Sequence, residues 1–377
     1  MLIAAITLAS IGKVVTFIVM LSILITLHEY GHFLVARRNG VRVNEFSIGM
    51  GPQIFGWTSK KSGTLYSLRA LPIGGYCAMQ GEDNKTTEAE QQREFREGQQ
   101  YADDNFQAKT PWQRLAVVLA GPFANFLLCY LLLFVAAITF GVPSPDHAQP
   151  VIQQVVKGSP ADGAGMHSGD RIVAIDGKAV SNGGALVDTI HGSLGKMLHV
   201  TYSRGGAETS VVVTPKSCPA PMSDKFGCIG FAPVPAYERV GFVQALTGSA
   251  IQFVNIADGT IGSIALLVTH FTKYIGQTAG PIGMGQAATT IQDWGWGPYF
   301  GFAAMISFAL GLFNLLPIPA LDGGRAAFII AELLRGKPVD PEKEAMVHFA
   351  GFAALMALIL LVAFHDIFRI ASGSGVL

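Results

Sequence analysis

The sequence predicts a polytopic α-helical membrane protein with about four transmembrane helices, a cytoplasmic β-hairpin loop and an inserted α+β domain. Half of the 377 residues are hydrophobic, and most of them gather in long runs instead of being spread evenly. The loop after the first run alternates apolar and polar residues around glycines, which is typical of β-hairpins. A longer stretch before the third run is polar and rich in strand signals, which favours a soluble domain.

Four apolar runs reach the ~20 residues that a helix needs to cross a bilayer about 30 Å thick. These runs cover residues 13–36, 115–142, 298–316 and 345–364. The second run contains Gly121 and Pro122, which we expect to interrupt its helix. With their flanking residues, we assign the four membrane segments to residues 1–36, 113–142, 298–325 and 345–365. No basic residue precedes the first apolar stretch, so we expect it to belong to the mature protein.

A weaker apolar run covers residues 242–275. Asn255, Asp258 and several glycines break its hydrophobic pattern. We therefore expect residues 236–297 to form helices that lie on the membrane surface or partly within it.

Basic residues near the ends of the runs predict the orientation, because cytoplasmic loops carry an excess of Lys and Arg. The basic residues flanking the first and second runs, and those between the third and fourth, are Arg37, Arg38, Arg42, Lys109, Arg114, Arg325, Arg335, Lys337 and Lys343. Loops 37–112 and 317–344 are therefore predicted to be cytoplasmic, and residues 143–297 to lie outside.

The first cytoplasmic loop has two parts. Residues 41–80 alternate apolar and polar side chains between glycine turns and are predicted to form β-hairpins. Residues 82–107 are polar and of mixed charge, which favours a surface helix or a simple tether.

The outside segment, residues 149–235, reads as a small domain rich in strands. Its stretch 158–180 predicts a turn, a short helix, a tight Gly-Asp turn and a strand, which resembles a PDZ domain. Such domains bind peptides or protein termini by adding a strand to a sheet edge. Cys218 and Cys228 bracket a proline-rich turn and could form a disulfide in an oxidising compartment.

The chemistry is organised around HEYGH, residues 28–32, near the end of the first run. His28 and His32 are four residues apart, so on a helix they share one face and can bind one metal ion. Glu29 lies beside the first ligand, where it can accept a proton from a metal-activated water. Ionisable groups at membrane depth are costly, which favours this reading over a chance pair of histidines at a helix end.

A catalytic zinc site normally takes three protein ligands and one open position. The first and third runs are predicted to cross in the same direction, so their last turns end at one membrane face. Asp322 is the first acidic residue after the third run, and Pro317 and Pro319 stop a regular helix before it. We therefore expect Asp322 to be the third ligand, although it could simply cap the helix that begins near Gly323.

HEYGH, GPFAN (121–125) and NLLPIPALDGG (314–324) occur in the order that is characteristic of the site-2 protease family of intramembrane zinc metalloproteases, which the chain resembles. SIGMG (47–51), LPIGGY (71–76), TAGPIGMG (278–285) and the PDZ-like insert are similar to its bacterial RseP-like branch. This chain departs from that branch in having one PDZ-like domain instead of two in tandem.

The resemblance implies one Zn²⁺ per chain, held by His28, His32 and Asp322, with Glu29 as the catalytic acid/base. It implies that Asn314 holds the substrate backbone. It also implies that the hairpin loop, around the glycines at positions Gly49, Gly51, Gly74 and Gly75, pairs with an unwound substrate strand. Asn314 could instead bond only helix backbone, and the glycines could only make turns.

The resemblance implies that the substrates are single-span membrane proteins, such as an anti-sigma factor. It also implies that the protease is a multi-pass protein of the bacterial inner membrane. The active site would lie near the cytoplasmic face, with the PDZ-like domain outside. The rival hypothesis is a non-catalytic membrane adaptor with a structural zinc, which would have no use for Glu29. A third hypothesis is a metal transporter. It would place its ligands near mid-membrane on several spans, whereas the ligands predicted here lie at one membrane edge.

Two further expectations complete the analysis. The net charge of zero argues against nucleic acid as a partner, whereas the apolar runs require the lipid bilayer. The remaining histidines lack a partner at ligand spacing, and His270, His348 and His365 are expected to lie on helix faces or at the interface.

Overall fold

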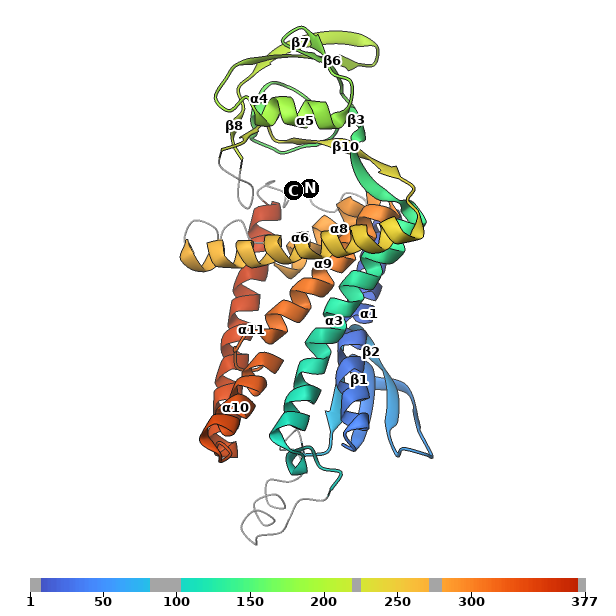
Figure 1. The fold of residues 1–377 in the computed structure, drawn as a ribbon, viewed down its shortest axis with the longest axis vertical. Helices are drawn as coiled ribbons and strands as arrows, with labels where there is room; N and C mark the ends of the chain where they lie inside the picture. Colours follow the sequence, from blue (N-terminus) through green and yellow to red (C-terminus); the bar gives the residue numbers. More distant parts are fainter. Residues whose placement is uncertain (1–7, 82–102, 219–224, 271–279, 372–377) are drawn as a thin grey trace. The chain divides into compact units, whose positions relative to one another are not determined.

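The computed structural model describes residues 8–81, 103–218, 225–270 and 280–371 (Figure 1). These residues fall into two compact units. The first unit comprises residues 1–132 and 280–364, and the second comprises residues 133–279 and 365–377. Residues 1–7 of the first predicted membrane segment, and most of the polar stretch 82–107, lie outside the described residues.

Within the described residues, five helices are long and apolar enough to cross a membrane. They are α1 (Leu8–Arg38), α3 (Pro111–Phe140), α6 (Phe242–Thr269), α9 (Trp296–Leu315) and α11 (Pro341–Ala371). Four of them coincide with the predicted spans, and the protein is a multi-pass membrane protein. The shorter helices of these parts are η1 (Phe106–Ala108), α8 (Pro281–Asp293) and α10 (Asp322–Arg335).

One expectation about a helix break was wrong. Helix α3 continues through Pro122, because a proline removes only one backbone hydrogen bond and leaves the rest of the helix intact. Helix α6 runs as one helix through Asn255 and Asp258 and is, by length and composition, a fifth candidate span. The expectation that residues 236–297 lie on the membrane surface or partly within it stays a prediction. Each glycine inside such a helix costs only about 1 kcal/mol, which the remaining backbone hydrogen bonds can outweigh.

The core of the helical part of the first unit lies between α1, α8 and α9. Phe17 and Leu24 of α1 pack with Ala288 of α8 and with Tyr299 and Ile306 of α9. These apolar contacts hold α1, which carries the HEYGH motif, against α9.

Strands β1 (Val43–Thr58) and β2 (Leu65–Met79) form one antiparallel hairpin whose strands are both irregular in register. Residues 45–48 of β1 pair with residues 65–68 of β2 and also with residues 75–78. Residues 53–58 pair with residues 65–69. The hairpin therefore forms four short segments in the order 53–58, 65–69, 45–48 and 75–79. Among the described residues, segment 75–79 is an edge with no strand on its outer side.

Three glycines allow the strands to bend. Gly49, Gly51 and Gly74 have φ values of +84°, +85° and +86°, a region that residues with a side chain rarely adopt. At Gly49 a Cβ atom would also lie 2.5 Å from the carbonyl oxygen of Leu71. The glycines that the sequence analysis singled out thus shape the hairpin.

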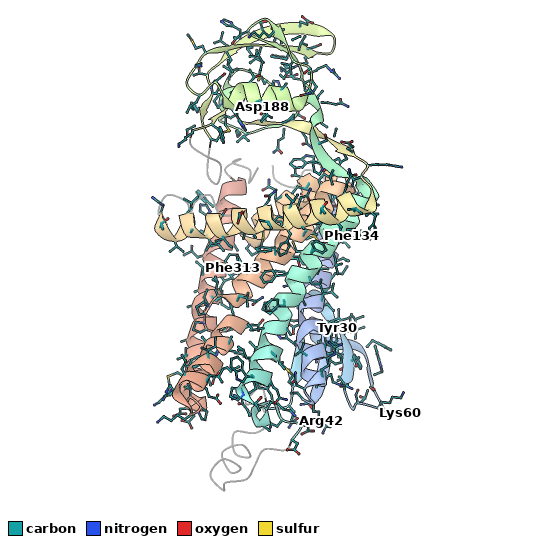
Figure 2. All side chains as sticks on the ribbon, in the orientation of Figure 1. Tyr30, Arg42, Lys60, Phe134, Asp188 and Phe313 are labelled. Carbon is teal, nitrogen blue, oxygen red and sulfur yellow. A yellow bond between two sulfur atoms is a disulfide. The ribbon has the colours of Figure 1, made fainter. Side chains whose placement is uncertain are left out.

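The hairpin packs against the end of α1. Phe46 and Met79 are buried with Ala36 of α1 and Val117 of α3. Tyr30, labelled in Figure 2, lies on α1 with its ring centroid 6.4 Å from that of Phe46. This contact brings segment 75–79 close to the HEYGH turn.

The second unit contains the predicted β-rich insert, whose composition is consistent with a PDZ-like domain. Its sheet has the strand order β10-β3-β4-β6-β7, with β5 paired to β4. The elements are β3 (Val142–Val155), α4 (Pro160–Gly163), β4 (Arg171–Ile175), β5 (Lys178–Ala179), α5 (Gly183–His191), β6 (Leu198–Arg204), β7 (Ala207–Val213), β8 (Lys216–Ser217), β9 (Gly227–Cys228) and β10 (Phe231–Glu238). Strands β3 and β10 extend the sheet to residues 142 and 238, beyond the 149–235 expected.

The insert has its own apolar core, formed where α5 covers the sheet. Ile152, Ile172, Leu186 and Val200 are each at most 1% exposed. Asp170 is equally buried and accepts two hydrogen bonds of 2.7 Å from the Arg204 guanidinium. The strands therefore belong to a folded domain with a satisfied buried charge.

Candidate active site

His28 and His32 lie one turn apart on α1, and each is 7% exposed. Their Nε2 atoms are 3.2 Å apart. Asp322 Oδ2 lies 3.1 Å from Nε2 of His28 and 3.3 Å from Nε2 of His32. The structure therefore brings the three predicted metal ligands to one point.

Asp322 is the first residue of α10, and the cap position before it is Leu321. Its carboxylate is directed at the two imidazoles, so the simple capping role considered for Asp322 is not what the structure has. Gly323 permits this turn, because a Cβ there would lie 2.2 Å from the carbonyl oxygen of Leu316. The chain can therefore fold back tightly after α9.

A hydrogen bond to the backbone decides which nitrogen of His32 carries the proton. His32 Nδ1 lies 2.8 Å from the carbonyl oxygen of Val117, so Nδ1–H donates and Nε2 keeps its lone pair. Asp322 Oδ2 is buried and, among the described residues, has only the imidazoles beside it. Lone pairs this close repel one another unless a cation lies between them, so the donor set fits a zinc ion.

Asn125 orients the other imidazole and was not identified as a site residue from the sequence. It is fully buried on α3, and its amide nitrogen Nδ2 lies 3.1 Å from Nδ1 of His28. When Nε2 of His28 binds a metal, Nδ1 carries the proton, and the Asn125 amide accepts it once Oδ1 and Nδ2 are exchanged by a flip of the amide, as in the outer shell of many metal sites. A polar residue within an apolar span was the signal available in the sequence.

Small residues let α3 approach α1 at the cluster. A Cβ at Gly121 would lie 2.2 Å from Nε2 of His32, and a Cβ at Gly31 would lie 2.4 Å from the carbonyl oxygen of Ala120. Gly121 therefore leaves the space in which the imidazoles meet.

Glu29 faces a cavity of about 640 Å³. The cavity is bounded by α1, by the edge segment of the hairpin and by the turn before α10, and its lining includes Glu29, His32, Tyr76, Ala78, Ala320 and Asp322. An extended chain could thus lie between the hairpin edge and the metal-binding cluster.

None of the predicted substrate-binding residues is among those that line this cavity. Gly75 precedes the lining residue Tyr76, and a Cβ at Gly75 would be 3.8 Å from Cγ of Glu29. Gly49, Gly51 and Gly74 lie at the bends of the hairpin. Asn314 is half-buried in the last turn of α9 and does not line the cavity.

A polar network supports the cavity wall formed by the hairpin. Burial acts to raise the pKa of Glu45, but hydrogen bonds from Ser67, Arg69 and Tyr76 outweigh it and hold that pKa below its usual range. Burial and the hydrogen bond to Glu45 raise the pKa of Tyr76 to about 12. Tyr76 therefore remains a neutral hydroxyl beside the cavity at neutral pH.

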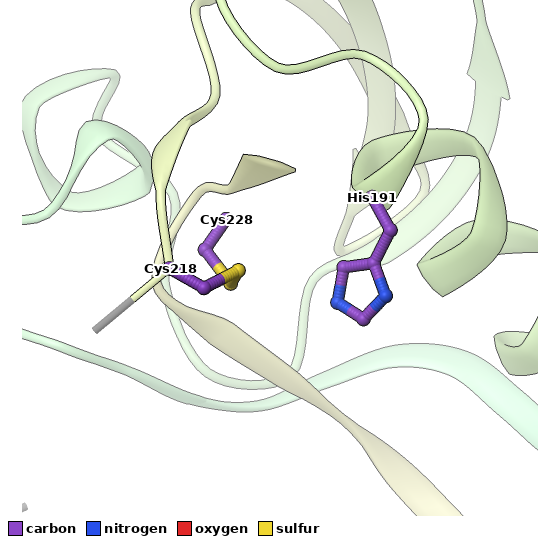
Figure 3. Close-up of side chains that lie close together, drawn as sticks. All are labelled: His191, Cys218 and Cys228. Atoms are coloured by element: carbon purple, nitrogen blue, oxygen red, sulfur yellow. A yellow bond between two sulfur atoms is a disulfide. The ribbon is translucent and has the colours of Figure 1, made fainter. Parts of the chain in front are cut away.

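A second group of potential ligands lies in the insert, where His191 faces Cys218 and Cys228 (Figure 3). The two cysteines form a disulfide, with their Cα atoms 4.9 Å apart. Both sulfurs are therefore used in a covalent bond and are not free as metal ligands.

Membrane-spanning helices that carry an H-E-x-x-H centre define an intramembrane metalloprotease. The model of peptidase family M50 matches residues 16–358, and the chain belongs to this family. The protein is an intramembrane zinc metalloprotease of the type that carries out regulated intramembrane proteolysis.

Relatives resemble the chain over nearly its whole length. The zinc metalloprotease RasP of Geobacillus kaustophilus is 31% identical, over 95% of this chain and 98% of its own. The regulator of sigma-W protease RasP of Bacillus subtilis is 31% identical, over 96% of this chain and 99% of its own. A putative zinc metalloprotease of Rhizobium meliloti is 32% identical, over 93% of this chain and 95% of its own.

The Gly121 contact predicts that Gly121→Ala abolishes metal binding, because the added methyl would overlap the imidazole of His32. Zinc content of the purified protein, measured by mass spectrometry, should fall from about one ion per chain to near zero. The matched control is Gly301→Ala, on α9, where a Cβ would meet open space. Full zinc content in Gly121→Ala would contradict this packing.

Proposed function

We propose that His28, His32 and Asp322 hold one zinc ion per chain and that Glu29 is the catalytic acid/base. The observation that carries the proposal is the convergence of two imidazole nitrogens and a carboxylate oxygen, 3.1 to 3.3 Å apart, beside a cavity that Glu29 lines. Three protein ligands with one open side are the arrangement of catalytic zinc sites.

The reaction is hydrolysis of a peptide bond within or near a transmembrane segment. A zinc ion supplies Lewis acidity, which brings the pKa of a water molecule near 7 and polarises a carbonyl. Glu29 accepts the proton of the attacking water and returns it to the leaving amine. The adaptor alternative, with a structural zinc, gives no role to Glu29 or to the cavity.

The substrates are single-span membrane proteins whose helix unwinds before cleavage. A helix hides its carbonyl groups in i to i+4 hydrogen bonds, so they are not open to attack. Segment 75–79 is the outer segment of the hairpin sheet and lines the cavity, so an unwound strand can be added alongside it. Gly49, Gly51 and Gly74 support this role by bending the hairpin so that Gly75 approaches Glu29.

Two details of the substrate complex rest on the family. Asn314 would hold the substrate backbone near the end of α9, although it lies outside the cavity lining. The Bacillus subtilis relative is named for regulation of sigma-W, which supports a membrane-bound anti-sigma factor as the substrate here.

The location is the bacterial inner membrane, with the active site near the cytoplasmic face and the PDZ-like domain outside. The basic residues at the ends of the helices and the disulfide support this orientation. The edge strand β10 would bind peptides or protein termini. Binding of a substrate terminus that persists after deletion of residues 149–235 would refute this role.

The sidedness predicts opposite labelling of two exposed lysine positions changed to cysteine. In intact cells, a membrane-impermeant thiol reagent should label Lys196→Cys and leave Lys60→Cys unlabelled until the membrane is opened. The two native cysteines outside the disulfide, Cys77 and Cys129, are buried and give little background. Labelling of Lys60→Cys alone in intact cells would show that the orientation is the reverse of the one proposed.

Glu29→Gln should keep the zinc content of the wild type and lose cleavage by about 10²- to 10⁴-fold, because the amide cannot accept the proton. Both quantities are measured on purified protein in detergent, with a single-span model substrate. The control is Glu342→Gln, an exposed residue at the start of α11, which should leave both unchanged. Equal cleavage by Glu29→Gln and the wild type would sink the mechanism.

Local unwinding predicts that helix-breaking residues in the substrate favour cleavage. Changing a glycine in the substrate span to Leu should slow cleavage about fivefold, and changing a proline should slow it up to about a hundredfold, as their helix propensities indicate. The same change one residue outside the span is the control. An unchanged kcat/KM for both span variants would count against unwinding.

A further inference from the structure

The segment that connects α9 to Asp322 contains a strained turn. Leu321 N–H donates to the carbonyl oxygen of Ile318 at 3.2 Å, which closes a β-turn with Pro319 and Ala320 at its centre. Ala320 has a φ of +78° and, with Asp176, is one of two residues other than glycine with positive φ among the described residues. Proline followed by a positive φ is the signature of a type II turn.

Alanine is a poor residue for this position. A side chain disfavours the left-handed region about tenfold, and type II turns usually have glycine there. Strained backbone of this kind persists only when its surroundings hold it. The turn therefore needs support from outside its own four residues.

Helix α11 supplies that support through His348. Ala320 N–H donates to Nδ1 of His348 at 2.9 Å. This amide belongs to the central peptide of the turn, whose orientation distinguishes type II from type I. Oε1 of Glu344, one turn earlier, lies 4.0 Å from Nε2 of His348, which favours the tautomer that leaves Nδ1 free to accept.

A second contact joins the same helix to the same turn. A Cβ at Gly351, three residues after His348, would lie 2.4 Å from Cβ of Pro319 and 2.8 Å from its carbonyl oxygen. On the other side, a Cβ at Gly324 of α10 would lie 2.4 Å from the carbonyl oxygen of Ile318. The turn is thus enclosed between α10 and α11, which lie close together (Figure 1). The two helices also meet through Phe328 and His348, whose ring centroids are 5.5 Å apart.

The turn determines where Asp322 lies. Asp322 follows the turn after one peptide bond, and Ala320, Leu321 and Asp322 all line the cavity. Loss of the hydrogen bond at Ala320 would release the central peptide, and the carboxylate would lose its fixed approach to the histidines. A metal centre binds tightly only when its ligands are held in place by their surroundings.

We propose that His348 is a positioning residue of the zinc centre, whose Nδ1 holds the strained turn at Ala320 and thereby places Asp322. This inference rests on the proposed role of Asp322 as a zinc ligand. It differs from the expectation that His348 is only a helix-face residue, and it assigns α11 a role in metal binding.

The test measures zinc affinity of the purified full-length protein by competition with a chelator. His348→Leu should bind zinc about tenfold more weakly than the wild type, because the turn loses its acceptor. His348→Asn should bind as the wild type does, because its amide oxygen is attached to Cγ, as Nδ1 of histidine is, and can accept the same bond. Ala320→Gly combined with His348→Leu should restore the affinity, because glycine adopts the turn without support.

A role limited to packing would give another pattern. Equal weakening by His348→Leu and His348→Asn, no weakening by His348→Leu, or no rescue by Ala320→Gly would each overturn the proposal. If His348→Leu does not fold, the double variant decides: restored folding supports the proposal, and failure to fold overturns it. Asp322→Ala is tested in parallel, since full zinc affinity in that variant would refute the ligand role itself.

Discussion

The structure depends on holding two imidazole nitrogens and a carboxylate oxygen within about 3 Å of one another in a membrane protein. In a medium of low dielectric constant, such lone pairs repel and a bare carboxylate is costly. The arrangement is therefore stable only if a cation joins the three atoms and the surrounding helices hold them. The close helix contacts and hydrogen bonds around the cluster hold the three ligand atoms in place.

The surroundings hold the cluster by close backbone approach. Gly121 leaves the volume in which the imidazoles meet, and Gly323 lets α10 begin directly beneath α9. Val117 and Asn125, both on α3, engage the Nδ1 atoms, so one helix orients both histidines. In a bilayer the hydrophobic effect does not drive helices together. Small residues at helix contacts instead let the backbones come close enough for extensive van der Waals contact.

The proposed role of the hairpin concerns the complementary problem of how a substrate strand is held. An unwound strand in a membrane exposes backbone groups that have no water to bond, and these groups must find partners in the protein. The outer segment of this bent sheet, residues 75–79, lines the same cavity as Glu29. The network of Glu45, Arg69 and Tyr76 keeps this wall polar and in place.

Much of this protein could be predicted from the sequence, because the decisive signals are local. Long apolar runs predict spans, the four-residue spacing of His28 and His32 predicts a shared helix face, and alternation around glycines predicts the hairpin. Asp322 could be predicted to join His28 and His32 from the order of the spans, since the first and third spans cross in the same direction and end at one membrane face.

The tertiary structure decided what depends on contacts between residues distant in sequence. The continuity of α6 and the order of the four hairpin segments have no local signature. Asn125 stands out as a polar residue in an apolar span, but its contact with His28 is visible only in the tertiary structure. The same holds for His348, which looks like one more helix-face residue until α11 packs on the Pro319–Ala320 turn. Sequence periodicity determines which side chains share a face, whereas the packing of separate helices determines which faces meet.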